Sequence, residues 1–334
     1  MKKAVLLVNL GTPDTPEVKD VGIYLKEFLN DPRVIDLPNP KRFLLVNGII
    51  IPARVKNSSK IYKEIWQKDG SPLLLYSKQV QYLLQKELGD EKYKVFLAMR
   101  YRKPSLPDVL NEIQKFSWEE IIVFPMFPQY ASASTGTAHQ LIMEIVKKWQ
   151  VIPKITFINS YFQHPAFINV WKELGSSYNF KSYDHILFSY HGLPERHILK
   201  AEYEAGCLSD NCCSFFTDRN YFCYRAQCFE TTRKITTALN IPTSAYTTTF
   251  QSRLGKDPWI KPYTDKVLVD MISKGNKRFL VFAPAFVSDC LETIHEIGVE
   301  YDELTKEHGA EKVELVPSLN NHPAWINAIK EIIQ

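Results

Sequence analysis

Short apolar runs alternate with longer amphipathic segments along almost the whole chain. Runs of strand length occupy residues 4–9, 94–99, 121–124 and 154–159, and again residues 185–190, 244–249, 279–284 and 312–316. Helical patterns fall between them, for example at residues 77–88, 106–115, 136–149, 226–239 and 265–274. Parallel strands need long crossover connections, which are usually helices. The alternation therefore predicts an α/β fold in which helices cover both faces of parallel sheets.

The two sets of predicted strands resemble each other. Residues 6–13 (LLVNLGTP) and 187–194 (LFSYHGLP) each join an apolar strand to a Gly-x-Pro turn, and residues 122–127 (IVFPMF) parallel residues 281–286 (VFAPAF). At 334 residues the chain is long enough for two domains, and we expect residues 1–165 and 166–334. Two explanations of this likeness remain open. One is an internal duplication with a cleft between the halves, and the other is a chance similarity of two unrelated strand–turn units.

The composition is that of a soluble globular protein, with 45% hydrophobic and 23% charged residues. A formal net charge of +4 without a block of Lys and Arg argues against a nucleic-acid partner. No apolar stretch approaches the ~20 residues that span a bilayer. The apolar run after Lys2 and Lys3 superficially resembles a signal peptide, but it stops at residues 11–14 (GTPD) without a small-residue cleavage site. We therefore expect a cytoplasmic protein in which this apolar run forms the first strand and not a signal peptide.

A histidine follows the strand that begins the second half. Residues 187–197 (LFSYHGLPERH) lead into a turn with Gly192 and Pro194, which places His191 at the carboxyl end of the strand. Open α/β sheets bind their ligands at that end. Residues 288–293 (SDCLET) begin an acidic helix in which Glu292 and Glu296 are one turn apart. We expect this turn, the cysteine-rich stretch directly behind it and the acidic helix to form one functional assembly, although a lone histidine at a strand end is more often a hydrogen-bonded structural residue.

One segment departs from the alternation. Residues 38–60, here called the apolar flap, contain the apolar runs 43–46 and 49–52, flanked by basic side chains at Lys41, Arg42, Arg54 and Lys56. One interpretation is a helix packed on the core. The other is an exposed apolar surface with a basic rim, suited to a greasy anionic ligand or to shallow contact with a membrane.

Five of the six cysteines lie in one short stretch, which we take as an insertion at about residues 203–228. Their spacing is C-x4-C-C-x9-C-x4-C, at Cys207, Cys212, Cys213, Cys223 and Cys228. Disulfides are disfavoured in a reducing cytoplasm, and the paired C-x2-C knuckles usual for structural zinc are missing. The number of thiols fits an iron–sulfur cluster, with zinc as the alternative.

Six motifs, in order along the chain, resemble those of the ferrochelatase family. They are residues 8–13 (VNLGTP), 98–101 (AMRY), 127–130 (FPQY), 189–194 (SYHGLP), 250–255 (FQSRLG) with 258–259 (PW), and 289–293 (DCLET). The resemblance covers essentially the whole chain. It implies two Rossmann-like, doubly wound domains of similar topology with a porphyrin cleft between them. The implied activity is insertion of ferrous iron into protoporphyrin IX to give protoheme, the terminal step of heme biosynthesis.

Three functions other than iron insertion into protoporphyrin IX remain open. These are a coproporphyrin ferrochelatase, a related tetrapyrrole chelatase, and a non-enzymatic porphyrin or heme carrier. Relatives that act on coproporphyrin lack most of the apolar flap, so the flap favours protoporphyrin. The acidic residues Glu292 and Glu296 argue against a carrier.

The resemblance also assigns roles to single residues. It implies that His191, Glu292 and Glu296 are catalytic and that His191 and Glu292 handle the substrate iron. An imidazole suits this role because its ordinary pKa of ~6.5 leaves it mostly neutral and able to accept a pyrrole proton. The porphyrin-facing positions of the family match Leu10, Arg100, Tyr101, Gln251, Ser252, Trp259 and Phe286.

Two features depart from the animal enzymes of the family. Cys290 occupies a position where those enzymes have a histidine. Many bacterial relatives also have a cysteine at this position. The cysteines of the insertion resemble those of bacterial members that hold an internal 2Fe-2S cluster, which implies four ligands among the five, with one of Cys212 and Cys213 spare. The resemblance allows a monomer or a homodimer and peripheral membrane contact through the apolar flap.

Overall fold

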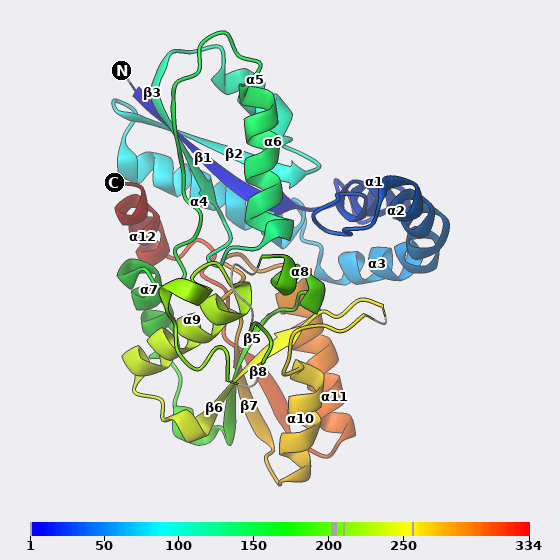
Figure 1. Ribbon diagram of the computed structural model, residues 1–334. Helices are drawn as coiled ribbons and strands as arrows, with labels where there is room; N and C mark the ends of the chain where they lie inside the picture. The colour runs from blue at the N-terminus through cyan, green and yellow to red at the C-terminus, as the bar shows by residue number, and fades with distance from the viewer. Residues whose placement is uncertain (1, 202–205, 210, 256) are drawn as a thin grey trace. The chain divides into compact units, whose positions relative to one another are not determined.

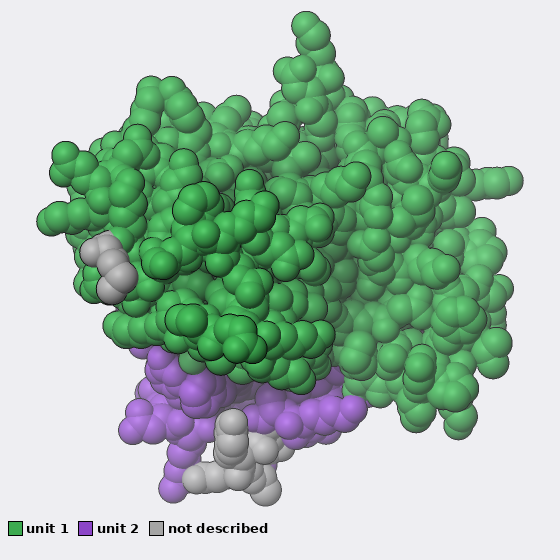
Figure 2. All heavy atoms as spheres, turned by 90° about the horizontal axis from the view of Figure 1, so that it is seen from above, with its two compact units in different colours: residues 1–127, 131–160, 321–334 green, residues 128–130, 161–320 purple. Residues whose placement is uncertain are grey.

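The computed structural model describes residues 2–201, 206–209, 211–255 and 257–334. The chain forms two compact units, coloured separately in Figure 2. The first comprises residues 1–127, 131–160 and 321–334, and the second comprises residues 128–130 and 161–320. The last helix thus belongs with the N-terminal part of the chain, and the division is not a single cut after residue 165. Of the expected cysteine insertion, residues 203–205 and 210 lie outside the described residues.

The first unit is built on a parallel sheet with the strand order β2-β1-β3-β4. Its strands are β1 (Lys2–Gly11), β2 (Tyr93–Tyr101), β3 (Trp118–Pro125) and β4 (Lys154–Phe157). In the register, Val5 of the central strand β1 is opposite Val95 of β2 and Ile122 of β3. Residues 4–8 are completely buried, as expected for a strand covered on both faces.

Helices cover both faces of this first sheet (Figure 1). Helices α5 (Leu106–Ile113) and α6 (Thr137–Val146) pack on the face that carries Leu6 and Val8. Helix α4 (Pro72–Leu88) contacts β1, β2 and α12 (Pro323–Ile333). On the α12 side, the Phe124 and Trp325 rings lie 6.1 Å apart.

A separate helical group follows β1 in the first unit. It consists of α1 (Val18–Leu29), α2 (Asn39–Leu45), a π-helical turn η1 (Val46–Ile50) and α3 (Ile51–Ile65), which lie together beyond the carboxyl end of β1 in Figure 1. The apolar flap is therefore helical, as the first interpretation predicted. Yet Phe43, Leu44 and Ile49 are 52%, 69% and 64% exposed, so much of its apolar surface is not packed on the core.

The second unit repeats the arrangement of the first, with the strand order β6-β5-β7-β8. The strands are β5 (His185–His191), β6 (Tyr246–Gln251), β7 (Arg278–Phe282) and β8 (Lys312–Leu315). Both sheets thus place the first strand of the unit second in the sheet and the second strand at an edge. This equivalence of topology is what the repeated strand–turn motifs suggested.

Helices also cover both faces of the second sheet. One face packs against α10 (Thr264–Ser273), the π-helical segment η6 (Glu292–Glu300) and α11 (Tyr301–Glu307). On the other face are α7 (Pro165–Gly175) and α9 (Tyr224–Leu239), where Trp171 and Phe188 both contact Phe282. The remaining short helices are η2 (Ser132–Gly136) in the first unit, and η3 (Phe180–Ser182), α8 (Glu195–Lys200), η4 (Asp218–Asn220) and η5 (Thr243–Ala245) in the second.

The predicted α/β fold with helix-covered parallel sheets is confirmed. All eight predicted strands are present, with ends that differ by three residues or fewer. None of the described helices combines the length and the apolar character that a bilayer crossing demands.

Candidate active site

His191 is the last residue of β5, and its neighbour in the register on β6 is Gln251. The Gly192 N–H donates to the Gln251 carbonyl oxygen at 2.8 Å. A Cβ atom at Gly192 would come within 2.8 Å of that oxygen and 3.2 Å of the Trp259 ring. Only glycine therefore fits the turn that leads the chain away from His191.

The imidazole of His191 has one nitrogen fixed by the backbone. Its Nδ1 lies 2.6 Å from the carbonyl oxygen of Gly192. Because a carbonyl oxygen only accepts, Nδ1 carries the proton, and the neutral ring keeps its lone pair on Nε2. The Tyr224 hydroxyl donates to the carbonyl oxygen of His191 at 2.8 Å and so fixes the end of the strand. Phe286 lies beside the imidazole, with ring centres 6.5 Å apart.

Glu296 is a half-buried carboxylate that accepts hydrogen bonds from three residues. Ser252 donates its backbone N–H at 2.8 Å and also its hydroxyl, the Tyr301 hydroxyl donates at 3.0 Å, and Gln251 Nε2 lies at 3.3 Å. Burial raises the pKa of Glu296, while the bond from Ser252, the positive charge that His191 carries when it is protonated, and the bond from Tyr301 act in the opposite direction. Ser252 adopts a φ of 66°, rarely seen outside glycine, in the conformation that directs both donors to Glu296.

Glu292 lies at the start of the π-helical segment η6 and belongs to the same group. Its backbone carbonyl oxygen accepts from Gln251 Nε2 at 3.1 Å. Its negative charge raises the pKa of Glu296. The second unit therefore gathers His191, Glu292 and Glu296, the residues to which the resemblance assigned catalytic roles.

Gln251 is oriented by residues that sequence reasoning did not single out. The Ser189 hydroxyl donates to Gln251 Oε1 at 2.6 Å, so the amide nitrogen points toward Glu292 and Glu296. Ser189 in turn bonds Thr264 at 2.9 Å. The alternation of β5 could have identified Ser189, since it shares a face of that strand with His191. Nothing in the sequence pattern indicated that Tyr301 bonds Glu296.

Asp289 and Cys290 are held in the structure around the start of η6. Asp289 accepts from Thr293 at 3.0 Å, from the Ser318 backbone at 3.2 Å and from Asn320 at 2.7 Å. Cys290 is buried, which raises the pKa of its thiol well above the ordinary value. The carboxylate of Asp289 thus anchors the loop that precedes η6.

Trp259 is also nearly buried. Its ring nitrogen donates to the Leu254 carbonyl oxygen at 3.0 Å, and the residue is 8% exposed. Its contact with the turn at Gly192 links the packing of the indole to the position of His191.

The predicted porphyrin contacts Leu10, Arg100 and Tyr101 lie in the first unit. Arg100 Nη2 forms an ion pair with the buried carboxylate of Asp31 at 2.6 Å, and Arg100 Nε donates to Thr137 at 2.8 Å. Tyr101 is 2% exposed and donates its hydroxyl to Asp31 at 2.9 Å, whereas Leu10 is partly exposed. A hollow of about 640 Å³ is lined by Asp31, Arg100 and residues of α1 and the apolar flap. Arg100 therefore faces an open space. Tyr101 is buried, and its ring packs against the guanidinium of Arg100.

Three thiols of the cysteine insertion, those of Cys212, Cys213 and Cys223, lie close to one another. Cys212 Sγ is 3.6 Å from Cys213 Sγ, and Arg225 Nη1 approaches the two sulfurs at 3.6 and 3.2 Å. A hydrogen bond between Cys213 and Cys223 raises the pKa of Cys213 and lowers that of Cys223 to about 6. Cys228 is completely buried, and Cys207 is partly exposed. Within the described part of the chain, no three His, Cys, Asp or Glu side chains converge as ligands of a metal ion.

The fold with its repeated four-stranded sheets is similar to that of solved chelatase structures. A sirohydrochlorin chelatase, SirB of Bacillus subtilis subspecies spizizenii in complex with cobalt, superposes with a TM-score of 0.54 over 100% of this chain and 94% of that chain, at 11% identity. SirB from Bacillus subtilis with Fe³⁺ gives a TM-score of 0.55 over 100% and 96% of the two chains, at 10% identity. At these identities the likeness concerns the fold alone.

The sequence comparisons are more specific. The profile of the ferrochelatase family matches residues 2–334. Ferrochelatases of Legionella pneumophila (strain Lens) and Coxiella burnetii (strain Dugway 5J108-111) are each 44% identical. The alignments cover 100% of this chain and 99% of the first relative, and 99% of this chain and 93% of the second. The chain belongs to the ferrochelatase family, whose members are lyases that insert a metal into a porphyrin.

Proposed function

We propose that this chain inserts ferrous iron into protoporphyrin IX and that His191 Nε2 is the atom at the reacting centre. The observation that supports this most is the fixed tautomer of His191 beside the half-buried carboxylate of Glu296. In the reaction two pyrrole N–H bonds break and the metal forms bonds to the porphyrin nitrogens. Two protons leave, and no electrons are transferred.

The three polar side chains divide this work. The Nε2 lone pair of His191 either accepts a pyrrole proton or presents the metal, since both need an unprotonated nitrogen. Glu292 and Glu296 supply the negative charge that offsets the metal or the protonated imidazole. Three hydrogen-bonding residues hold Glu296 in place, so its carboxylate does not need to reorganise during the reaction.

The porphyrin contacts follow the residues carried over from the family. Arg100 uses Nε and Nη2 within the first unit, which leaves Nη1 as the donor for a propionate. Phe286 offers an apolar ring next to His191, and Leu10 offers an apolar side chain at the end of β1. Gln251, Ser252, Trp259 and Tyr101 act mainly by holding these groups in position.

The exposed apolar surface of the flap favours protoporphyrin IX over a porphyrin with four carboxylates. The direct test is the rate of iron insertion with protoporphyrin IX and with coproporphyrin III under anaerobic conditions. We expect a kcat/KM at least tenfold higher for protoporphyrin IX. A higher kcat/KM for coproporphyrin III would identify the chain as a coproporphyrin ferrochelatase. If iron were inserted into neither porphyrin, the remaining function would be that of a porphyrin or heme carrier.

We also propose that the apolar flap makes shallow contact with anionic membranes. Phe43, Leu44 and Ile49 are exposed, and Lys41 and Arg54 are exposed in the same helical group. Apolar side chains beside cations suit an interface with anionic lipids. Sedimentation with vesicles of anionic and of zwitterionic lipid tests this, with the Leu44→Ser/Ile49→Ser variant expected to lose binding to anionic vesicles.

Finally, we propose that four of the five clustered cysteines hold a 2Fe-2S cluster. The donor chemistry fits, because thiolates are the ligands of such clusters and Cys212, Cys213 and Cys223 lie in successive contact. Arg225 would balance part of their negative charge. When bound, the cluster would cross-link the insertion and make it sensitive to oxidants, and no step of iron insertion is assigned to it.

The cluster is tested by the absorption spectrum and the iron and sulfide content of anaerobically purified protein. The Cys223→Ser variant should lose visible absorbance and melt at a lower temperature. Cys290→Ala, which removes the cysteine outside the insertion, is the matched control and should retain the spectrum. Wild-type protein without iron or sulfide, or with zinc in their place, would reject the cluster.

A further inference from the structure

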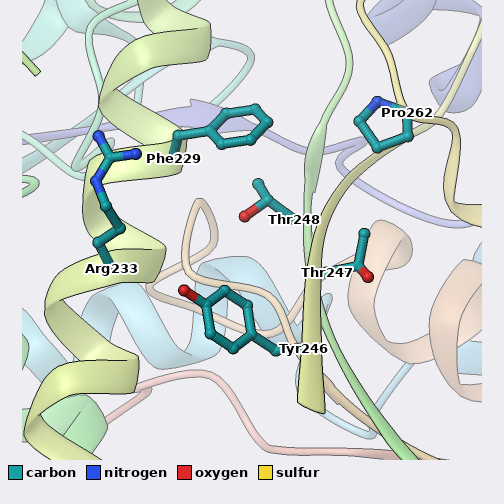
Figure 3. A pocket seen from close by; sticks show the side chains of 6 residues that line it. All are labelled: Phe229, Arg233, Tyr246, Thr247, Thr248 and Pro262. Atoms are coloured by element: carbon teal, nitrogen blue, oxygen red, sulfur yellow. The ribbon is translucent and has the colours of Figure 1, made fainter. Parts of the chain in front are cut away.

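A second cavity lies at the free edge of the sheet in the second unit, apart from the residues of the candidate active site. It has a volume of about 370 Å³ and lies between α9 and the edge strand β6. Its lining consists of Phe229, Arg233, Tyr246, Thr247, Thr248 and Pro262, which Figure 3 shows around one space. Thr247 and Thr248 point to opposite faces of β6, so the cavity reaches around the edge of the strand.

The edge of β6 carries unpaired backbone groups in this cavity. The Phe250 N–H donates to the Pro262 carbonyl oxygen, outside the sheet, at 2.8 Å. Alternate residues of a strand direct their N–H and C=O groups to the same side. The N–H and C=O groups of Tyr246 and Thr248 therefore also face away from β5. No described residue forms a backbone hydrogen bond with these groups at the free edge of β6. Thr248 is only 6% exposed, and buried backbone groups are nearly always paired, so this edge is suited to a partner.

Arg233 provides a charged donor beside that edge. Its Nε bonds Glu230 at 2.8 Å and its Nη1 bonds the Cys213 carbonyl oxygen at 3.0 Å. Its Nη2 is buried and has no partner among the described residues. A buried guanidinium N–H without an acceptor is costly, and a carboxylate is the acceptor that matches it best.

Apolar groups form another part of the lining. Phe229 and Pro262 provide it, together with the ring of Tyr246, as seen in Figure 3. The space therefore combines three elements, namely an unpaired strand edge, one free guanidinium donor and an apolar wall. An extended peptide whose last residue is apolar satisfies all three, because it adds backbone hydrogen bonds, a terminal carboxylate and a side chain.

We propose that this cavity, here called the edge pocket, binds the carboxyl-terminal end of an extended peptide with an apolar last residue. The peptide pairs with Tyr246 and Thr248, its terminal carboxylate accepts from Arg233, and its last side chain packs on Phe229. The inference does not depend on the proposed iron insertion, and its test does not use that activity.

The test measures the binding of a fluorescent, N-terminally blocked tetrapeptide of alternating alanine and threonine that ends in leucine. Fluorescence anisotropy should show saturable binding, and the same peptide with a carboxyl-terminal amide should bind at least tenfold more weakly. Arg233→Met should cause a similar loss. Lys234→Met, which removes a neighbouring exposed cation of the same helix outside the lining, should leave binding unchanged.

A second variant tests the strand edge itself. In the backbone, Thr248→Pro removes only an N–H that faces away from the sheet, where proline is tolerated, and it should weaken peptide binding at least fivefold. Unfolding midpoints confirm that each variant is folded. Equal binding of acid and amide peptides, or no binding, would overturn the proposal. A different outcome would be that 4-methylpentanoate, at the same concentration as the peptide, displaces the peptide, and that the Thr248→Pro variant binds as tightly as the wild type. That outcome would overturn the proposal of a peptide ligand in favour of a small free acid.

Discussion

Ser252 donates both its backbone N–H and its side-chain hydroxyl to the carboxylate of Glu296. The two residues are 44 positions apart in the sequence and lie on different elements, one just after β6 and the other in η6. Ser252 adopts a strained φ to make both contacts. The arrangement fixes Glu296 next to His191, and it makes the position of this carboxylate the most tightly specified feature of the candidate active site.

Replacing Ser252 by alanine should therefore slow iron insertion. A hydrogen bond to a charged group contributes about 1.5–3 kcal/mol, so we expect kcat to fall by about 10- to 100-fold. Ser252→Gly is the informative companion, because glycine relieves the strain at positive φ but also lacks the hydroxyl. Both variants should be similarly slow in steady-state assays. A Ser252→Gly variant with wild-type kcat would show that the hydroxyl is unimportant.

Gly192→Ala should disturb the turn after His191. The added methyl group would overlap the Gln251 carbonyl oxygen at 2.8 Å, and a backbone atom cannot move aside at low cost. We expect at least a tenfold loss of kcat together with a lower melting temperature. Gly48→Ala is the control, since no heavy atom lies within 4 Å of a Cβ at that position. If both variants kept wild-type activity, the turn would not determine the position of the imidazole.

Arg100→Met should destabilise the first unit as well as weaken porphyrin binding. The substitution leaves the buried Asp31 without its cationic partner, and breaking such a pair costs about 3 kcal/mol. Urea denaturation would measure this loss. The double variant Asp31→Asn/Arg100→Met should recover part of the stability but not the affinity for porphyrin. Full recovery of affinity would assign Arg100 a purely structural role.

His139 makes the stability of the first unit depend on pH. Burial lowers the pKa of this side chain to about 4, and its Nε2 has no hydrogen-bond partner among the described residues. Between pH 6.5 and 4 the unfolded chain binds a proton that the folded chain does not, so stability falls as the pH falls. The loss approaches about 1.4 kcal/mol per pH unit.

The variant His139→Phe should remove this contribution while it keeps the ring contact with Phe157. Urea midpoints at pH 7 and pH 5 should therefore differ less in the variant than in the wild type. The exposed His308 provides the control variant His308→Gln, which should retain the wild-type dependence. An unchanged dependence in His139→Phe would mean that folding does not lower the pKa of His139.

The sequence was most informative where local pattern determines structure. The strand that ends at His191 was predictable because an apolar run meets Gly192 and Pro194, and parallel strands were predictable from the helix-length connections. The apolar flap was predicted as either a packed helix or an exposed surface. It is helical and also exposes Phe43 and Leu44, because its helices pack mainly on one another and on α1.

The contacts that complete the site could not be predicted in the same way. Asp31 pairs with Arg100 across 69 positions, and Ser189 orients Gln251 across 62 positions. Such pairs depend on strand register and on how helices pack on the sheet, which a local pattern does not specify. Tyr301 reaches Glu296 from the first residue of α11, at the end of a π-helical segment whose unusual turn was not anticipated.

The most direct test of the account is the His191→Ala variant, assayed for iron insertion and for protoporphyrin binding with the same protein. We expect insertion to fall by at least 1,000-fold while the dissociation constant for protoporphyrin, measured by fluorescence quenching, changes less than threefold. His308→Ala, at an exposed position of the same unit, should behave as wild type. Substantial turnover by His191→Ala with intact porphyrin binding would contradict the assignment of His191 as the residue at the reacting centre.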